Sequence, residues 1–144
     1  MPGSRRPLLS LSFPANYLDT GESFMRERGL DVAEFHRFCG VPYPRAAVPW
    51  QTINGLQMQR AMLRFLQVHT DDRPPLVSYM AHCAVTTHGP IGMLAITAHN
   101  LGEALEGALS HAPLVMPAYT MRRHDLRDQV HIVFDRRHDF GGVN

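Results

Sequence analysis

The chain of 144 residues has little cysteine, and this shortage excludes several classes of protein. Only Cys39 and Cys83 are present. They are too few for the disulfide framework of a small secreted domain, and they lack the paired spacing of a zinc motif. The sequence therefore predicts two buried thiols in a protein of a reducing compartment.

The chain is also short of net charge and of long hydrophobic runs. Its formal net charge is +1, and no basic block exceeds a pair of arginines, whereas a free-standing nucleic-acid-binding domain usually carries a positive stripe. The apolar stretch after Arg5-Arg6 is too short for an export signal, and no stretch reaches transmembrane length. We therefore expect residues 1–144 to form a single cytoplasmic domain with no membrane partner.

Residues 89–109 contain two successive helix starts. Gly89 and Pro90 begin an apolar segment with little polar face, which predicts a short buried helix. Asn100 and Glu103 then have the spacing of a capping box, and apolar residues recur behind them at three- and four-residue intervals. The stretch predicts a helix–helix corner in the core, and by itself it carries no chemistry.

The same stretch resembles a known family. Gly89-Pro-Ile-Gly92, an apolar helix, a short polar break and Leu101-Gly-Glu-Ala-Leu105 resemble the middle of the N-terminal effector-binding domain of AraC/XylS-type transcriptional regulators. The similar branch is the arabinose-binding type, which includes ornithine-utilisation regulators. Arg28-Gly-Leu-Asp31 resembles the end of the family's first helix, and the similarity covers Leu18 to Asp135.

The resemblance implies a small-molecule-sensing domain without enzymatic turnover and without a cofactor. It also implies an effector of unspecified identity, a homodimer, and contact with DNA only through a helix-turn-helix domain that these residues lack. We therefore expect a truncated or excised sensory module. A ligand-free module for dimerisation or protein interaction is the alternative.

The first half of the chain predicts one strand and several helices. We expect the strand over Leu8–Phe13 and a helix over Asn16–Arg28, which Gly29 ends in a left-handed conformation. Asp31 begins a second helix that turns Phe35, Phe38 and Cys39 inward, and Gly40 ends it.

A loop over Val41–Val48 leads to Pro49, which opens the longest predicted helix, Trp50–Val68. Leu76–Val85 is ambiguous between helix and strand, and a short helix is favoured. The helix of the corner is expected to end at His111-Ala-Pro113.

Near the end, the hydrophobic period changes from helical to alternating. Tyr119–Arg123 and Gln129–Phe134 predict a hairpin around a turn at Asp125–Asp128. A lone hairpin is marginally stable in water, so it must pack on helices or on further strands. The expected fold class is α+β, a helical cluster packed on a small antiparallel sheet with a C-terminal hairpin.

The histidines invite a metal or catalytic interpretation. His36 and Cys39 have helical spacing, but no further ligand is evident, so ordinary helix packing is favoured over a metal site. His82, Cys83 and His88 suggest a Cys–His nucleophilic pair. No acidic residue lies nearby in sequence to orient it, so we expect no enzyme activity.

The tetrapeptide Arg-Arg-His-Asp occurs twice, at Arg122–Asp125 and Arg136–Asp139. On the predicted hairpin the two copies lie at opposite ends of the second strand. Four guanidinium groups suit recognition of a carboxylate or phosphate. Solvated edge charges that discourage strand-to-strand aggregation are the favoured interpretation.

The candidate ligand-binding residues are Trp50, Tyr79, His82 and His88. Trp50 lies at the predicted start of the long helix, and the other three lie on or beside the apolar segment before the corner. Ligand pockets combine apolar walls with a few convergent polar groups, and these residues fit that description. An ordinary core with satisfied side chains explains each of them as well, and is favoured for each residue taken alone.

Overall fold

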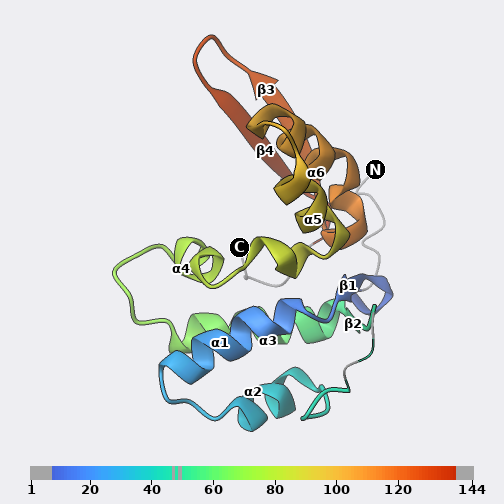
Figure 1. Ribbon diagram of the computed structural model, residues 1–144. Helices are drawn as coiled ribbons and strands as arrows, with labels where there is room; N and C mark the ends of the chain where they lie inside the picture. Colours follow the sequence, from blue (N-terminus) through green and yellow to red (C-terminus); the bar gives the residue numbers. More distant parts are fainter. Residues whose placement is uncertain (1–7, 47, 49, 139–144) are drawn as a thin grey trace, which may run out of the picture.

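The computed structural model describes residues 8–46, 48 and 50–138, which form an α+β fold of two parts (Figure 1). In the first part, three helices pack on one another beside a two-stranded antiparallel sheet, and in the second, two helices pack beside a hairpin. The predicted fold class is thus confirmed. The described elements are η1 (Leu8–Ser10), β1 (Ser12–Pro14), α1 (Tyr17–Glu27), α2 (Val32–Cys39), β2 (Thr52–Asn54), α3 (Gly55–Val68), α4 (Pro75–Ala81), η2 (Val85–His88), α5 (Pro90–Thr97), α6 (Leu101–Val115), β3 (Tyr119–Asp125) and β4 (Val130–Arg136).

The core of the first part lies between α1, α2 and α3. Phe24 and Phe35 are almost fully buried, and the Phe24 ring packs on Phe65 with 4.3 Å between the centroids. Gly21 allows α1 and α2 to approach closely, because a Cβ there would lie 2.6 Å from Cζ of Phe35. Phe38, expected to point inward, is 39% exposed and lies under the Arg64 guanidinium, so that prediction was wrong.

Several helix ends follow the local sequence signals. Asp31 begins α2 by accepting a hydrogen bond from the Ala33 N–H at 2.8 Å. Gly29 adopts the predicted left-handed conformation, with a φ of 66°, and Gly40, which was predicted to end the helix, is also left-handed, with a φ of 73°. The short helix favoured over residues 76–85 is present as α4, which ends at Ala81.

The predicted start of the long helix at Trp50 was wrong, and Pro49 lies outside the described residues. Residues 52–54 form β2 instead, in which Ile53 pairs with Phe13 of β1. Asn54 then accepts from the Gln57 N–H while the Gln57 side chain accepts from the Asn54 N–H, both at 3.0 Å. This reciprocal capping box satisfies two otherwise unpaired donors, so α3 begins at Gly55.

The strand expected over Leu8–Phe13 was also placed too early. Residues 8–10 form the short helix η1, and the strand β1 runs from Ser12 to Pro14. Among the described strands, β1 pairs with β2 alone, so β1 is an edge strand and a proline is tolerated at its end.

Helix α5 is much less buried than its composition predicted. Ile91 and Gly92 face η2 and α6, but Met93, Leu94 and Ile96 are each about half exposed. The prediction of a buried helix was wrong because only one side of α5 is covered. The other side forms a wall of the cleft described below.

Helix α6 begins at the predicted cap but ends later than expected. Asn100 accepts from the Glu103 N–H at 2.9 Å, whereas the Glu103 carboxylate accepts from the His99 N–H. Pro113 does not stop the helix, which continues to Val115 although Pro113 has no N–H to donate to the carbonyl four residues earlier.

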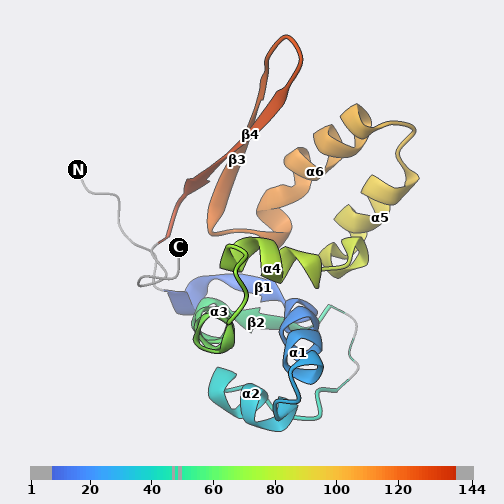
Figure 2. The ribbon, with the colours of Figure 1, turned by 90° about the vertical axis from the view of Figure 1, so that its left-hand side faces the viewer.

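The C-terminal hairpin begins near the end of α6 and runs back beside this helix, and its tip projects past the start of α6 (Figure 2). Its first strand packs on α6, but Val130 and Phe134 remain 43% and 54% exposed. Arg122 forms an ion pair with Asp135 on the opposite strand at 2.6 Å, and Arg123 forms one with Asp125 at 2.7 Å. The arginines of the first Arg-Arg-His-Asp copy are therefore already engaged by carboxylates of the hairpin. Residue 139, the aspartate of the second copy, lies outside the described residues.

Candidate ligand-binding cleft

A cleft of about 1330 Å³ lies between the two parts of the fold. One wall consists of β1, the first turn of α1 and the loop residues Arg45, Ala46, Val48, Trp50, Gln51 and Thr52. The other wall consists of residues 88–97 together with the end of α6. Apolar side chains from both walls line it, among them Phe13, Pro14, Val48, Ile91, Met93, Leu94 and Leu114. A cleft between two structural units, with apolar walls, is the common setting for a small-molecule site.

The two walls are joined at one side by a small buried cluster. Tyr17 from α1, Ile91 from α5 and Val115 from α6 pack together, and each is less than a tenth exposed. The Asn16 side-chain amide adds a hydrogen bond across the joint to the carbonyl of Thr87. These contacts fix how the second part sits on the first.

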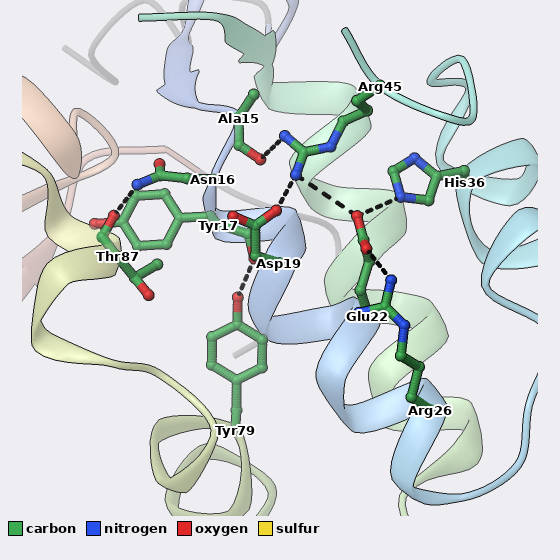
Figure 3. A network of polar contacts seen from close by, with 10 residues as sticks. All are labelled: Ala15, Asn16, Tyr17, Asp19, Glu22, Arg26, His36, Arg45, Tyr79 and Thr87. Carbon is green, nitrogen blue, oxygen red and sulfur yellow. Dashed lines mark hydrogen bonds and ion pairs between the residues drawn. The ribbon is translucent and has the colours of Figure 1, made fainter. Parts of the chain in front are cut away.

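Arg45 provides the positive charge of the cleft, and its partners are drawn in Figure 3. Its guanidinium donates to the carbonyl of Ala15 at 2.8 Å, pairs with Asp19, and lies 3.6 Å from Glu22 Oε1. Burial lowers the pKa of Arg45, but an arginine stays charged at neutral pH. The cation is therefore already neutralised by carboxylates of α1.

Behind Arg45, Glu22 connects α1 to α2. Its carboxylate lies 2.8 Å from His36 Nε2 and 2.9 Å from the Arg26 guanidinium. The His36 side chain is fully buried, and its Nδ1 has no hydrogen-bond partner in the described part of the chain. The geometry thus places His36 in an ionic network.

Cys39 has a different environment from His36, although both lie on α2. Burial raises the pKa of the Cys39 thiol to about 12, so the thiol stays protonated, and a protonated thiol is a poor metal ligand. Among the residues that the structure describes, no group of three or more histidine, cysteine or acidic side chains could hold a metal ion.

His88 lies where the cleft meets the joint. Its Nδ1 is 2.7 Å from the Tyr17 hydroxyl, and its Nε2 is 3.7 Å from Cys83 Sγ. Burial lowers the pKa of His88 and raises that of Tyr17 well above its usual range, so at neutral pH the imidazole is neutral and the phenol protonated. The Tyr17 O–H therefore donates to Nδ1, which leaves the His88 proton on Nε2, directed at Cys83. A tyrosine rather than an acid thus orients the imidazole.

Of the four ligand residues predicted from the sequence, the structure places two in the lining of the cleft and two outside it. Trp50 and His88 line the cleft, Trp50 with 79% of its surface exposed. Tyr79 lies behind it, donating to the carbonyl of Tyr17 at 3.2 Å. His82 packs edge-on against Phe24 and lies 3.2 Å from Glu27, and it is not among the residues that line the cleft.

Trp50 also has an unusual backbone, with a φ of 64°. Bulky residues rarely adopt this left-handed conformation, and strained positions of this kind cluster at functional sites. Arg45, Asp19 and Gln51 also line the cleft, and the sequence interpretation did not identify them. Arg45 and Asp19 are 26 positions apart, so no local spacing indicates their contact.

Comparison with known families finds a match over most of the chain. The family model described as the N-terminal arabinose-binding domain of AraC transcription regulators matches residues 29–143. A search of curated proteins finds no match to the chain. None of the described helices is long and apolar enough to cross a membrane.

The matched residues include one wall of the cleft in full, and Arg45, Trp50 and Gln51 on the other, whereas β1 and the start of α1 precede the match. A domain of this family is the ligand-sensing, regulatory part of a transcription regulator. Because the match covers most of the sequence, the chain belongs to the family of N-terminal arabinose-binding domains of AraC transcription regulators.

Proposed function

We propose that this domain holds a small-molecule effector in the cleft between its two parts and transmits occupancy to a DNA-binding domain of the same regulator. The observation that carries this proposal is the apolar cleft of about 1330 Å³ in a domain of a regulatory family. A transcription regulator with this domain acts in the cytoplasm, and the domain binds its effector without turnover.

An effector can regulate only if it binds one state of the protein more tightly than another. A molecule that contacts both walls favours one position of α5 and α6 relative to α1. Trp50 and His88 are the proposed contacts, one from each wall. Tyr79 acts as a positioning residue, because its hydroxyl holds the backbone of Tyr17 from behind.

The single tryptophan of the chain makes the proposal directly testable. Trp50 is largely exposed at the cleft, so a bound molecule should shift its fluorescence emission to shorter wavelength. L-arabinose, which the family's description suggests, and L-ornithine belong in the first panel, together with other sugars, amino acids and neutral apolar molecules. A true ligand must also raise the melting temperature, since it binds only the folded state.

A matched pair of variants locates the binding site. Leu94→Glu places a charge in the cleft, whereas Val133→Glu places one on the exposed hairpin. We expect Leu94→Glu to abolish the response to a hit and Val133→Glu to preserve it. Equal responses of the two variants would contradict the proposed location of the binding site in the cleft.

The alternative is a ligand-free dimerisation module, and the projecting hairpin favours it. Val130 and Phe134 are exposed there, and in the described residues β3 and β4 pair only with each other, so both outer edges are open. A tight dimer in sedimentation experiments that Phe134→Asp dissociates, together with an empty ligand screen, would establish this alternative in place of the sensor.

A further inference from the structure

We infer that the cleft accepts an uncharged, mainly apolar molecule longer than a monosaccharide, and that the Gln51 side-chain amide binds its polar group. The inference rests on the proposed function and specifies the chemical class of the effector. It follows from the charges, the free hydrogen-bonding groups and the size of the cleft.

The ionisable groups in the lining are Asp19, Arg45 and His88, and each already has a partner. Asp19 and Arg45 form an ion pair, and Glu22 lies behind them as a second carboxylate near the guanidinium. Both ring nitrogens of His88 are engaged, and the imidazole is neutral because burial lowers its pKa. A charged ligand would leave water without finding a free counter-charge, which is unfavourable.

Most polar side chains of the two walls also already form hydrogen bonds or ion pairs within the protein. The Asn16 amide donates to the carbonyl of Thr87, and the Thr97 hydroxyl donates to the carbonyl of Met93 at 3.0 Å. The side chains of Ser12, Gln51 and Thr52 make no hydrogen bond to a residue that the structure describes, and Oδ1 of Asn16 and Nε of Arg45 also have no partner there. Of the three side chains, only that of Gln51 is half-buried, and its backbone is fixed by Ala15 and Val48. An amide both donates and accepts, so Gln51 can bind a hydroxyl or a carbonyl group.

The size of the cleft argues against a small polar ligand. Pockets of roughly 300–1,000 Å³ already enclose a drug-sized molecule. A monosaccharide in a cleft of about 1330 Å³ would contact one wall and leave the apolar side chains of the other, such as Leu94 and Leu114, in water. An apolar molecule that reaches both walls removes that surface from water.

The test compares 1-octanol, octanoate and octylamine, which share one hydrocarbon chain and are neutral, anionic and cationic at neutral pH. Each is titrated into the complete chain while Trp50 emission is recorded, with L-arabinose as a fourth probe. We expect 1-octanol to shift the emission and to bind at least about tenfold more tightly than the two charged probes, because only they must bury an unpaired charge. L-arabinose should give no shift in the same range.

Variants of Gln51 test the polar contact. Gln51→Ala and the more nearly isosteric Gln51→Leu should each weaken 1-octanol binding several-fold, since a hydrogen bond is lost. Gln67→Ala on the exposed side of α3 is the matched control and should bind like the parent chain. Unchanged binding in both Gln51 variants would show that the Gln51 amide does not bind the polar group of the ligand.

The possible failures are distinguishable. Tighter binding of octanoate, octylamine or L-arabinose would overturn the inference and leave the proposed function standing. No response to the four probes would overturn the inference, and no response to the wider panel would overturn the proposed function as well. A shift of Trp50 emission with protein concentration alone would show that a second copy covers the cleft, which also overturns the inference.

Discussion

Glu22 and His36 illustrate how single residues hold the first part of the molecule together. A carboxylate that is mostly buried is tolerable only with partners, and Glu22 has three: His36, Arg26 and the more distant Arg45. His36 also packs against Tyr43, with 5.0 Å between the ring centroids. The network therefore connects α1 and α2 to the loop that carries Arg45. Because Arg45 lines the cleft, loss of the network should also disturb that wall of the cleft.

Replacing His36 with alanine should lower the free energy of unfolding by about 2–4 kcal/mol, because a buried hydrogen bond is lost and a cavity remains. Urea denaturation measures this change. His131→Ala on the exposed hairpin is the control and should change stability by less than about 0.5 kcal/mol. Equal, small changes in the two variants would mean that the Glu22–His36 contact contributes little.

His88 should make stability depend on pH. Burial lowers its pKa in the folded state from the ordinary 6.5, so below that pH the unfolded chain takes up a proton that the folded chain does not. The contribution of His88 is thus complete above pH 6.5 and is lost as the pH falls toward the lowered value. Between about pH 7.5 and about pH 5, the parent chain should lose more unfolding free energy than His88→Gln, as measured by urea denaturation. Equal losses of unfolding free energy in the parent chain and in His88→Gln would contradict the assignment of this pH dependence to His88.

At the scale of elements, the contact between α5 and η2 depends on Gly92. A Cβ at this position would lie 1.9 Å from the carbonyl oxygen of Val85, a backbone atom that cannot move alone. Gly92→Ala should therefore destabilise the domain by at least about 2 kcal/mol and shift α5 at the cleft wall. Thermal unfolding and Trp50 emission report the two effects.

Gly107→Ala in α6 is the matched control for this substitution. A Cβ there meets nothing within 4 Å, and alanine favours helix, so stability should rise by roughly 0.5–1 kcal/mol. If both alanine variants proved equally stable, close packing between α5 and η2 would be disproved.

Elements whose ends depend on neighbouring residues were predictable from sequence. Asp31, Gly40 and Asn100 mark helix ends through contacts a few residues away, and the structure has them as predicted. The capping box of Asn54 and Gln57 was an equally local signal that the sequence interpretation overlooked.

Features that depend on contacts between residues far apart in the sequence were not predictable. Strand β2 exists because residues 52–54 pair with a segment some forty residues earlier, and three residues show no usable period. The exposure of Met93 and Leu94 follows from where the two parts meet, and composition alone indicates burial. Of the four candidate ligand residues, the structure brings Trp50 and His88 to the same cleft, and the role of each stays a prediction.

At the scale of the whole molecule, the two parts meet at an apolar joint beside a wide cleft. They share the buried cluster of Tyr17, Ile91 and Val115, and Ala118 and Tyr119 of the second part also pack with the core of the first. A ligand that contacts both walls of the cleft is therefore expected to favour one relative position of the two parts. A molecule that bridges the walls adds contacts that the joint lacks. Occupancy and domain geometry are then coupled through differential affinity.

Hydrogen–deuterium exchange with the tightest ligand of the panel shows whether the ligand lies between the two parts. We expect slower exchange in both walls, over residues 12–19, 45–46, 48, 50–52 and 88–97, with no change at the hairpin tip around residues 125–130. Protection confined to the hairpin, or to one wall alone, would contradict a ligand held between the two parts.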